Sequence, residues 1–406
     1  MKILQISHNH HIVGGSDAVY FATSEMLTKA GHEVIPFCIA SPKNLASEWG
    51  GYFPPGADTG SAPIRDGFRY FFNAEAQRSL NRLLDRVGPV DVAHLHIYHG
   101  KQTPAILPVL KARGIRIVQS LHEYKLACPV YTLQRNGEPC DLCVQGSALN
   151  SVRHRCKDGS LLRSFIMAAE QMTSRMLGDV RLVDQFICVS DFQRRIMEQA
   201  GIPASKLNTL HNFVDTSAFR AGNGHDGYLL YFGRIEKLKG VPTLIEAVRR
   251  TGQRLLIVGD GAWRAEMLRR IEGLANIEYL GFHSGPELRR LIARARAVVV
   301  PSEWYENCPM SVLEAKALGR PVVGARIGGI PELIRDQVDG FLFEPGSSDE
   351  LVAALRVMER ADQALFSRNA RLDALARFSE ERHFSALMSY YSPKQPVNAL
   401  GELLTT

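Results

Sequence analysis

The second half of this 406-residue chain alternates short apolar runs with segments of helix length, and this alternation restricts the fold more than any other feature. Strands are expected at Tyr228–Phe232, Arg254–Val258, Ile277–Gly281, Ala297–Val300, Pro321–Gly324 and near Phe341. A strand–helix alternation of this kind covers both faces of a parallel sheet. We therefore expect a doubly wound α/β domain, with its ligand at the carboxyl ends of the strands.

The first half shows the same pattern less regularly. A strand at Lys2–Ser7, a helix over residues 17–30 and a strand at Glu33–Ile39 form a βαβ unit of the Rossmann type. The loop between them contains Gly14 and Gly15, which either let a ligand approach the backbone or serve only the turn. The G-x-G-x-x-G fingerprint is absent, which argues against a dinucleotide site.

Two glutamates flank the start of a predicted helix over residues 311–318. Glu306 precedes the helix and Glu314 lies inside it, while Pro309 suits its first turn. The amides from Met310 to Val312 are expected to point toward an anion, assisted by the helix dipole. Carboxylates beside an anion site suggest a ligand with both phosphate and sugar hydroxyls. Two ordinary surface glutamates around a capped helix are the equally compatible alternative.

Two cations follow the first strand of the second half. Arg234 comes directly after this strand, and Lys239 lies five residues further, where the next helix is expected to begin. Arg binds phosphate through its planar fork and Lys binds it as a point charge, so together they are suited to a diphosphate.

These motifs resemble the retaining glycosyltransferases of family 4. Glu306 and Glu314 match the two glutamates of the family's E-x7-E signature, and the segment from Arg234 to Gly240 matches its "GR…KG" segment. Further family motifs follow in the expected order at Val258–Gly261, Gly281–Phe282, Gly328–Glu332 and Asp339–Gly340. The resemblance implies the GT-B fold, in which two Rossmann-like doubly wound domains face each other across a cleft.

The resemblance also implies roles for individual residues. The expected catalytic residues are His122, which matches a family histidine that faces the transferred sugar, together with Glu306, Arg234 and Lys239. The expected donor-binding residues are Gly14, Gly15, Arg234, Lys239, Glu306, Asn307, Cys308, Pro309, Met310 and Glu314. Within this set, Arg234 and Lys239 hold the diphosphate and Glu314 holds the ribose. Glu306 and the amides near residues 308–310 hold the sugar.

The resemblance predicts retaining transfer of a sugar from a UDP- or GDP-sugar to a glycan acceptor, expected to be lipid-linked, in polysaccharide biosynthesis. No cofactor is expected for the transfer itself. Two alternatives are a GT-B enzyme of the nucleotide-sugar 2-epimerase type and a scaffold that binds sugar nucleotides without catalysis.

The expected domain boundaries follow from the same reading. Residues 1–212 form the N-terminal acceptor-binding domain, and residues 213–227 form a polar linker. Residues 228–378 form the C-terminal nucleotide-sugar domain. The resemblance implies that the helix at Glu380–Tyr391 crosses back to the first domain, and a loose tail is expected from Ser392 onward.

Four of the seven cysteines lie in an insertion over residues 123–160. Cys128, Cys140, Cys143 and Cys156 give the pattern C-x11-C-x2-C-x12-C. Four thiolates around a C-x2-C pair are compatible with a structural zinc site, which would order a long polar loop. Buried free cysteines are the alternative.

Charge and hydropathy restrict the partners. The net charge is +6, and the basic excess suits an anionic membrane surface or a phosphorylated acceptor, although solvated helix faces explain it as well. No pattern typical of nucleic-acid binding is present. The helix at Leu161–Leu177 is too charged to span a bilayer, so it is expected to pack in the domain, with lipid binding as the alternative. We expect a cytoplasmic protein, with peripheral contact at the inner face of the membrane as a further option.

Overall fold

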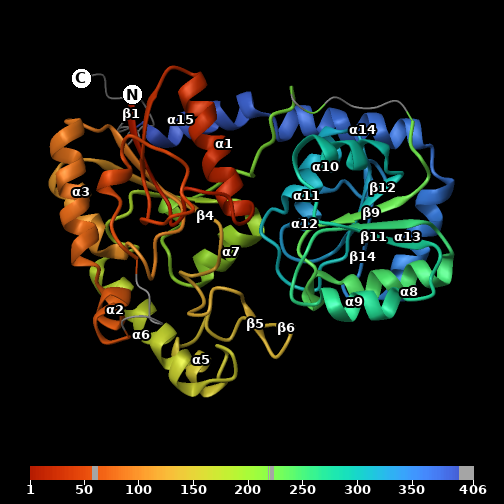
Figure 1. Ribbon diagram of the computed structural model, residues 1–406, viewed down its shortest axis with the longest axis horizontal. Coiled ribbons are helices and arrows are strands. Elements are labelled where there is room, and N and C mark those ends of the chain that lie inside the picture. The colour runs from red at the N-terminus through yellow and green to blue at the C-terminus, as the bar shows by residue number, and fades with distance from the viewer. Residues whose placement is uncertain (57–62, 218, 220–223, 393–406) are drawn as a thin grey trace, which may run out of the picture.

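The computed structural model describes all residues except 57–62, 218, 220–223 and 393–406. It contains two parallel sheets of six strands, one in each half of the chain, and a two-stranded hairpin. Figure 1 shows the halves side by side, each with helices around its sheet. The α/β prediction is therefore confirmed. The expected tail lies outside the described residues from position 393 onward, as does part of the expected linker.

The first sheet has the strand order β2-β1-β3-β4-β7-β8. Its strands are β1 (Lys2–Ile6), β2 (Glu33–Phe37), β3 (Val92–Leu95), β4 (Arg116–Leu121), β7 (Gln185–Cys188) and β8 (Leu207–Thr209). Its helices are α1 (Gly15–Lys29), α2 (Pro63–Phe71), α3 (Ala74–Val87), α4 (Leu107–Ala112), α5 (Leu149–Arg153), α6 (Leu161–Leu177) and α7 (Asp191–Gln199). The hairpin consists of β5 (Gln134–Arg135) and β6 (Glu138–Pro139).

The second sheet has the order β11-β10-β9-β12-β13-β14. Its strands are β9 (Leu229–Phe232), β10 (Leu255–Val258), β11 (Ile277–Gly281), β12 (Ala297–Val300), β13 (Val322–Ala325) and β14 (Gly340–Phe343). Its helices are α8 (Val241–Thr251), α9 (Arg264–Ile271), α10 (Gly285–Arg294), α11 (Met310–Ala317), α12 (Ile330–Leu333), α13 (Ser348–Arg360) and α14 (Gln363–Arg377). The strand order reverses between β9 and β12, so the loops after these two strands diverge at the point where such sheets bind ligands.

The last described helix, α15 (Glu380–Tyr391), packs against the first half of the chain. Its residues Leu387 and Tyr391 share an apolar cluster with Ile3, Val92 and Val118 from the first sheet. Within the residues that the structure describes, none of the helices has both the length and the apolar character to cross a membrane.

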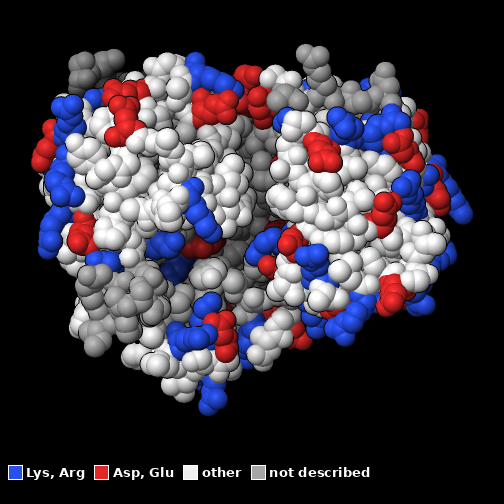
Figure 2. All heavy atoms as spheres, viewed as in Figure 1, with Lys and Arg blue, Asp and Glu red and all other residues white. Residues whose placement is uncertain are grey.

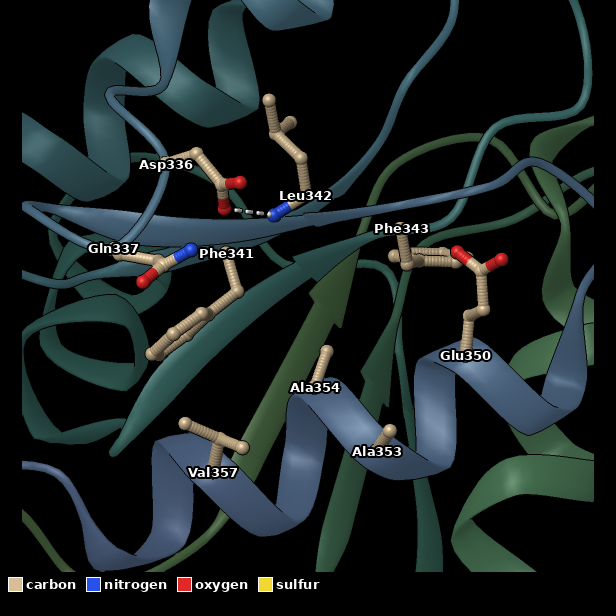
Figure 3. Close-up of a pocket in the computed structure, with 9 residues that line it drawn as sticks. All are labelled: Asp336, Gln337, Phe341, Leu342, Phe343, Glu350, Ala353, Ala354 and Val357. Carbon is tan, nitrogen blue, oxygen red and sulfur yellow. Dashed lines mark hydrogen bonds between the residues drawn. The ribbon is translucent and has the colours of Figure 1, made fainter.

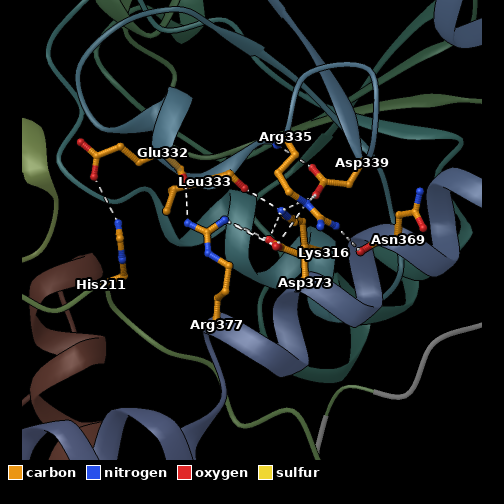
Figure 4. Close-up of polar contacts among 9 residues, drawn as sticks. All are labelled: His211, Lys316, Glu332, Leu333, Arg335, Asp339, Asn369, Asp373 and Arg377. Carbon is orange, nitrogen blue, oxygen red and sulfur yellow. Dashed lines mark hydrogen bonds and ion pairs between the residues drawn. The ribbon is translucent and has the colours of Figure 1, made fainter.

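A buried ion cluster fixes α11 in the second half (Figure 4). Lys316 is fully buried, and its Nζ lies 2.5 Å from a carboxylate oxygen of Asp373 and 3.1 Å from one of Asp339. It also donates to the carbonyl of Leu333. A buried ammonium is tolerated only when its donors are satisfied, and here two carboxylates and a carbonyl satisfy them. The cluster ties α11, which carries Glu314, to α12 and α14.

Candidate functional site at the switch point of the second sheet

Gly240 lies where the loop after β9 packs against the loop after β12, at the switch point of the sheet. It has a left-handed backbone with φ of 72°, and a Cβ at this position would lie 1.7 Å from the carbonyl oxygen of Pro301. Only glycine allows this approach. The loop after β9 therefore lies against the loop after β12, and their side chains meet.

Lys239 and Glu306 form the centre of this meeting. The Lys239 Nζ lies 2.5 Å from Glu306 Oε1, which also accepts a hydrogen bond of 2.6 Å from the Ser302 hydroxyl. Burial raises the pKa of the Glu306 carboxyl, but the charge of Lys239 and the hydrogen bonds from Lys239 and Ser302 outweigh it, so the net pKa is lowered. The Glu306 carboxyl is therefore ionised at neutral pH, and the Lys239 Nζ lies beside it at the switch point.

Trp304 lies beneath both predicted cations. The Lys239 Nζ is 4.9 Å from the centroid of its ring, and the guanidinium carbon of Arg234 is 6.0 Å away. Aromatic faces attract cations at such distances. Arg234 is exposed and forms an ion pair with Glu236. The structure thus brings Arg234, Lys239 and Glu306 together. The sequence analysis missed Trp304, although it follows β12 by only four residues.

The start of α11 differs from the sequence expectation. The helix begins at Met310, and Pro309 is its N-cap with an extended backbone, not a residue of its first turn. The amide of Val312 donates to the carbonyl of Pro309, so it is not available to an anion as predicted. Glu314 lies in the helix, half-buried, and desolvation raises the pKa of its carboxyl to about 7.

His122 follows β4 and belongs to a chain of buried polar side chains. Its Nε2 lies 2.8 Å from Nδ1 of His96, and the two rings stack with an interplanar angle of 2°. The Nε2 of His96 lies 2.8 Å from Oε1 of Gln5, whose amide nitrogen lies 3.4 Å from Nδ1 of His94. Tyr391 of α15 contacts the same Nδ1 at 2.7 Å. This series of hydrogen bonds therefore connects His122 with α15, the last described helix.

The hydrogen bonds of this chain determine the tautomer of His122. The oxygen of Gln5 can only accept, so Nε2 of His96 carries the proton and Nδ1 of His96 accepts. His122 must then donate through its Nε2. Burial lowers the pKa of His122 to about 4, so its ring is neutral at pH 7 and its Nδ1 is an acceptor. Such a ring can accept a hydrogen bond from a hydroxyl at Nδ1 and is not poised as an acid.

Asn307 and Glu332 connect the site with the first half. The side-chain amide nitrogen of Asn307, Nδ2, donates to the backbone carbonyl of His122 at 2.9 Å. The carboxylate of Glu332 accepts from the amides of Asp191 and Phe192, at 2.7 and 2.6 Å, where α7 begins. A carboxylate at a helix N-terminus is stabilised by the unpaired amides and the helix dipole. Figure 4 shows Glu332 reaching toward His211, also from the first half.

Gly14 and Gly15 lie at the start of α1. A Cβ at either position would meet no heavy atom within 4 Å, so both face open space. The amides of Val13 and Gly14 donate to the carboxylate of Asp17 at 3.0 and 3.1 Å. Asp17 was not identified from the sequence, and it occupies amides that an anion would otherwise contact.

Cys308 is buried in the loop before α11, and its carbonyl accepts from Asn212 of the first half. Burial raises the pKa of its thiol to about 12, so it is protonated at neutral pH. It lies in the site as a small apolar group, and the roles of Cys308 and Met310 stay predictions.

The four clustered cysteines lie near one another. Burial raises the pKa of Cys143 to about 12, and the thiols of Cys128, Cys156 and Cys140 add to this increase. Among the described residues, however, no three His, Cys, Asp or Glu side chains are placed to hold an ion. The zinc site therefore stays a prediction.

A pocket lies away from these residues. It has a volume of about 390 Å³ and lies between β14 and α13, where Phe341, Ala354 and Val357 line it (Figure 3). None of the predicted site residues contributes to it. A hollow separates the two halves of the molecule on the face in Figure 2.

Residues 13–218, about half of the chain, match the family described as Glycosyltransferase Family 4. The chain belongs to glycosyltransferase family 4. Residues 226–359 match the family described as Glycosyl transferases group 1. Both matches agree with the resemblance read from the motifs.

Individual relatives of this family 4 chain cover part of it. Sulfoquinovosyl transferase SQD2 of Arabidopsis thaliana is 29% identical over an alignment of 227 residues, and the match covers 49% of this chain and 44% of the relative. Glycogen synthase of Mycobacterium tuberculosis is 34% identical over 206 residues, 47% of this chain and 49% of the relative. The chain thus spans about half the length of the curated relatives it matches.

The solved structures confirm the fold. Alr3699/HepE of Anabaena, crystallised in complex with UDP, is 18% identical and superposes with a TM-score of 0.65. The superposition covers 96% of this chain and 99% of the Anabaena protein. Family membership and this likeness establish the GT-B fold that was expected from the sequence.

Proposed function

We propose that this protein is a hexosyltransferase that moves a sugar from a nucleotide-diphosphate sugar to a glycan acceptor with retention of anomeric configuration. The observation that carries this proposal is the cluster of Lys239, Arg234, Trp304 and Glu306 at the switch point of the second sheet. It places two cations where α/β sheets bind phosphates. Membership of family 4 supports the assignment of sugar transfer to this cluster.

The chemical difficulty is the departure of a diphosphate from the anomeric carbon. The bond from this carbon to the phosphate oxygen breaks, and a bond to the acceptor hydroxyl oxygen forms on the same face. The departing phosphate takes the acceptor's proton, so no enzyme nucleophile is required. Lys239 and Arg234 stabilise the charge that develops on the diphosphate. Because Glu306 and Trp304 already fix the position of the Lys239 side chain, this side chain needs little movement as charge develops on the diphosphate.

The remaining site residues bind the donor. Glu314 accepts from the ribose hydroxyls, and Glu306 with the amides near the start of α11 contacts the sugar. The neutral ring of His122 accepts a hydrogen bond from a sugar hydroxyl at Nδ1, because its Nε2 already donates to His96. Gly14 and Gly15 border the diphosphate from the first half, where the backbone is open.

A UDP-sugar is the donor to test before a GDP-sugar. The Anabaena protein with the same fold was crystallised with UDP, and also with UDP-glucose. We propose a lipid-linked glycan of polysaccharide biosynthesis as the acceptor class.

The test is a thermal-shift panel of UDP- and GDP-sugars, followed by incubation of each stabilising donor with and without acceptors. A donor that raises the melting temperature and is consumed only with an acceptor supports the proposal. Conversion of the donor to another nucleotide sugar without acceptor would indicate the epimerase alternative. Binding with neither transfer nor hydrolysis would indicate the scaffold.

A further inference from the structure

Helix α6 has an apolar exposed face and a polar buried face. Leu161, Phe165, Met172 and Met176 are spaced by four, seven and four residues, so they lie along one face of the helix. All four are exposed, Met176 by 81%, and Leu162 beside them is exposed by 66%. The buried positions are mostly polar, and they are Ser164, Ala168, Glu170, Gln171 and Ser174. This is the reverse of an ordinary surface helix.

The polar face is explained by what it contacts. Gln171 donates to the carbonyl of Lys125 at 2.8 Å, and Arg175 donates to the carbonyl of Leu126 at 2.7 Å. Glu170 forms an ion pair with Lys125. The helix thus satisfies the backbone of the loop that follows His122. Nothing in this packing requires the outer face to be apolar.

Helix α2 contacts α6 and carries further exposed aromatic side chains. Tyr70 of α2 donates to the sulfur of Met167 in α6 at 3.1 Å, so the two helices are in contact. Phe68 is exposed by 78%, and Phe72 directly after α2 is also exposed. We call the exposed side chains of Leu161, Leu162, Phe165, Met172, Met176, Phe68 and Phe72 the apolar stripe. Exposed apolar side chains gathered on neighbouring helices are typical of an interaction site.

The charges around the apolar stripe are mostly positive. Exposed basic side chains lie on α5, in the loop to α6, on α6 and just after it: Arg153, Arg155, Arg163 and Arg181. The acidic residues of the same segment are Asp158, which pairs with Arg163 and Lys157, and the buried Glu170 and Asp179. At the lower end of the molecule, where α5 and α6 lie, Figure 2 shows blue and red spheres among white ones, with more blue than red.

We infer that the apolar stripe docks on an anionic lipid bilayer, with α6 lying flat in the interface. Apolar side chains enter the boundary between headgroups and acyl chains, while flanking arginines attract anionic headgroups. The basic flank complements such a surface, and this selects a bilayer over a second copy of the chain, which would carry the same positive charge. The loop after His122 then lies directly behind the bound helix. If the proposed function holds, this position favours an acceptor carried by a lipid.

The experiment is flotation of the full chain with vesicles of phosphatidylcholine, alone or with phosphatidylglycerol. We expect binding to the mixed vesicles, weakened by salt, and little binding to pure phosphatidylcholine. Leu162→Gln with Phe165→Gln should lower the partition coefficient at least about tenfold, since both positions lose apolar surface that would be buried among the acyl chains. The matched control is Leu372→Gln with Leu375→Gln, two exposed leucines on α14 in the other half.

Melting temperatures of both double variants should equal that of the unchanged protein, because these side chains are exposed. Vesicle binding that is absent, or that is equal in both double variants, would overturn the inference. So would a dimer in light scattering that Leu162→Gln with Phe165→Gln dissociates, because a second copy would then cover the stripe. None of these outcomes depends on turnover, so they are independent of the proposed reaction.

Discussion

At the scale of single residues, the contact between Lys239 and Glu306 forms the centre of the candidate site. The motifs marked them as ligands of phosphate and sugar, but not as partners of each other. They are 67 positions apart, and only the left-handed backbone of Gly240 against Pro301 brings them together. Trp304 and Gln5 were missed for a related reason, since neither an aromatic after a strand nor an amide within a strand has a distinctive spacing.

Glu306→Gln should lower turnover by about 10²-fold or more, because a preorganised charge at the sugar and at Lys239 is lost. Affinity for the free nucleoside diphosphate should stay equal or increase, since Lys239 is released from its carboxylate. Glu314→Gln should instead weaken nucleotide affinity. Steady-state kinetics and calorimetric titration measure both quantities. Equal loss of nucleotide affinity in the two variants would contradict the separate roles of the glutamates.

The same change at Glu306 should also alter stability with pH. The folded pKa of this carboxyl is lowered, so its stabilising contribution is present above the unfolded pKa of about 4.5 and is lost as pH falls through the folded pKa. Glu306→Gln should therefore destabilise the protein at pH 7 more than at pH 3.5. Denaturant unfolding at both values measures the difference, and Glu344→Gln, at an exposed surface glutamate, is the control.

His122 should stay neutral and protonated on Nε2 from pH 8 down to about pH 5. Burial lowers its pKa to about 4, and Gln5 fixes the direction of the hydrogen bonds through His96. Nitrogen-15 NMR of labelled histidine distinguishes the tautomers. Gln5→Leu removes the acceptor for His96 and should produce a mixture at His122, with a change in kcat rather than in fold. Titration of His122 near pH 6.5 would be incompatible with this network.

At the scale of elements, the strands and long helices were predicted well because their apolar runs are buried in two parallel sheets. Helix α2 was not predicted, since residues 41–73 have no clear apolar period and tertiary contacts decide their conformation. Pro309 was expected in the first turn of α11, but it is the N-cap residue. The fixed φ of proline fits both positions, so the sequence did not distinguish them. The inverted face of α6 has an amphipathic period, but the period does not say which face is buried.

Gly240→Ala should destabilise the protein by about 3 kcal/mol or more and weaken nucleotide binding. A left-handed alanine alone costs about 1–2 kcal/mol, and its Cβ would also collide with the Pro301 carbonyl. Gly252→Ala is the matched control, because Gly240 precedes α8 and Gly252 ends it with a similar φ of 70°. A Cβ at Gly252 would meet no heavy atom within 4 Å. Gly252→Ala should lower the free energy of unfolding only by the cost of a left-handed alanine. Similar unfolding free energies for the two variants would argue against the contact between the loops.

The cysteine-rich segment leads to our proposal of a structural zinc ion. If the four clustered thiols close around one metal, purified protein should contain about one zinc per chain. Serine at any of Cys128, Cys140, Cys143 or Cys156 should remove the metal and lower the melting temperature by a similar amount. Because thiolate ligands must lose protons to bind, the unchanged protein should itself hold the metal more weakly as pH falls. Cys38→Ser should retain the metal. Metal-free protein with unchanged melting in chelator would exclude the site.

At the scale of the whole molecule, the two halves meet through contacts that no local pattern encodes. Glu332 caps α7 across a sequence separation of 141, and Asn307 bonds to the carbonyl of His122 across 185. The family motifs predicted that these halves face each other, but not which atoms join them. Through Asn307, the loop that carries Glu306 is bonded to the strand end that carries His122. A hydrogen bond therefore joins the expected donor side to the expected acceptor side.

The central claim is that Lys239 holds the diphosphate of the donor at this junction. Titration of UDP and GDP into the unchanged protein, Lys239→Ala and Lys237→Ala tests it most directly. Lys237 is an exposed lysine on the same short helical turn, so its removal controls for general loss of positive charge. Because Lys239→Ala leaves Glu306 without its cation, Lys239→Met with Glu306→Gln is titrated as well. We predict roughly tenfold or greater loss of affinity in both Lys239 variants and little change in Lys237→Ala. Equal affinities for the Lys239 and Lys237 variants would contradict the account.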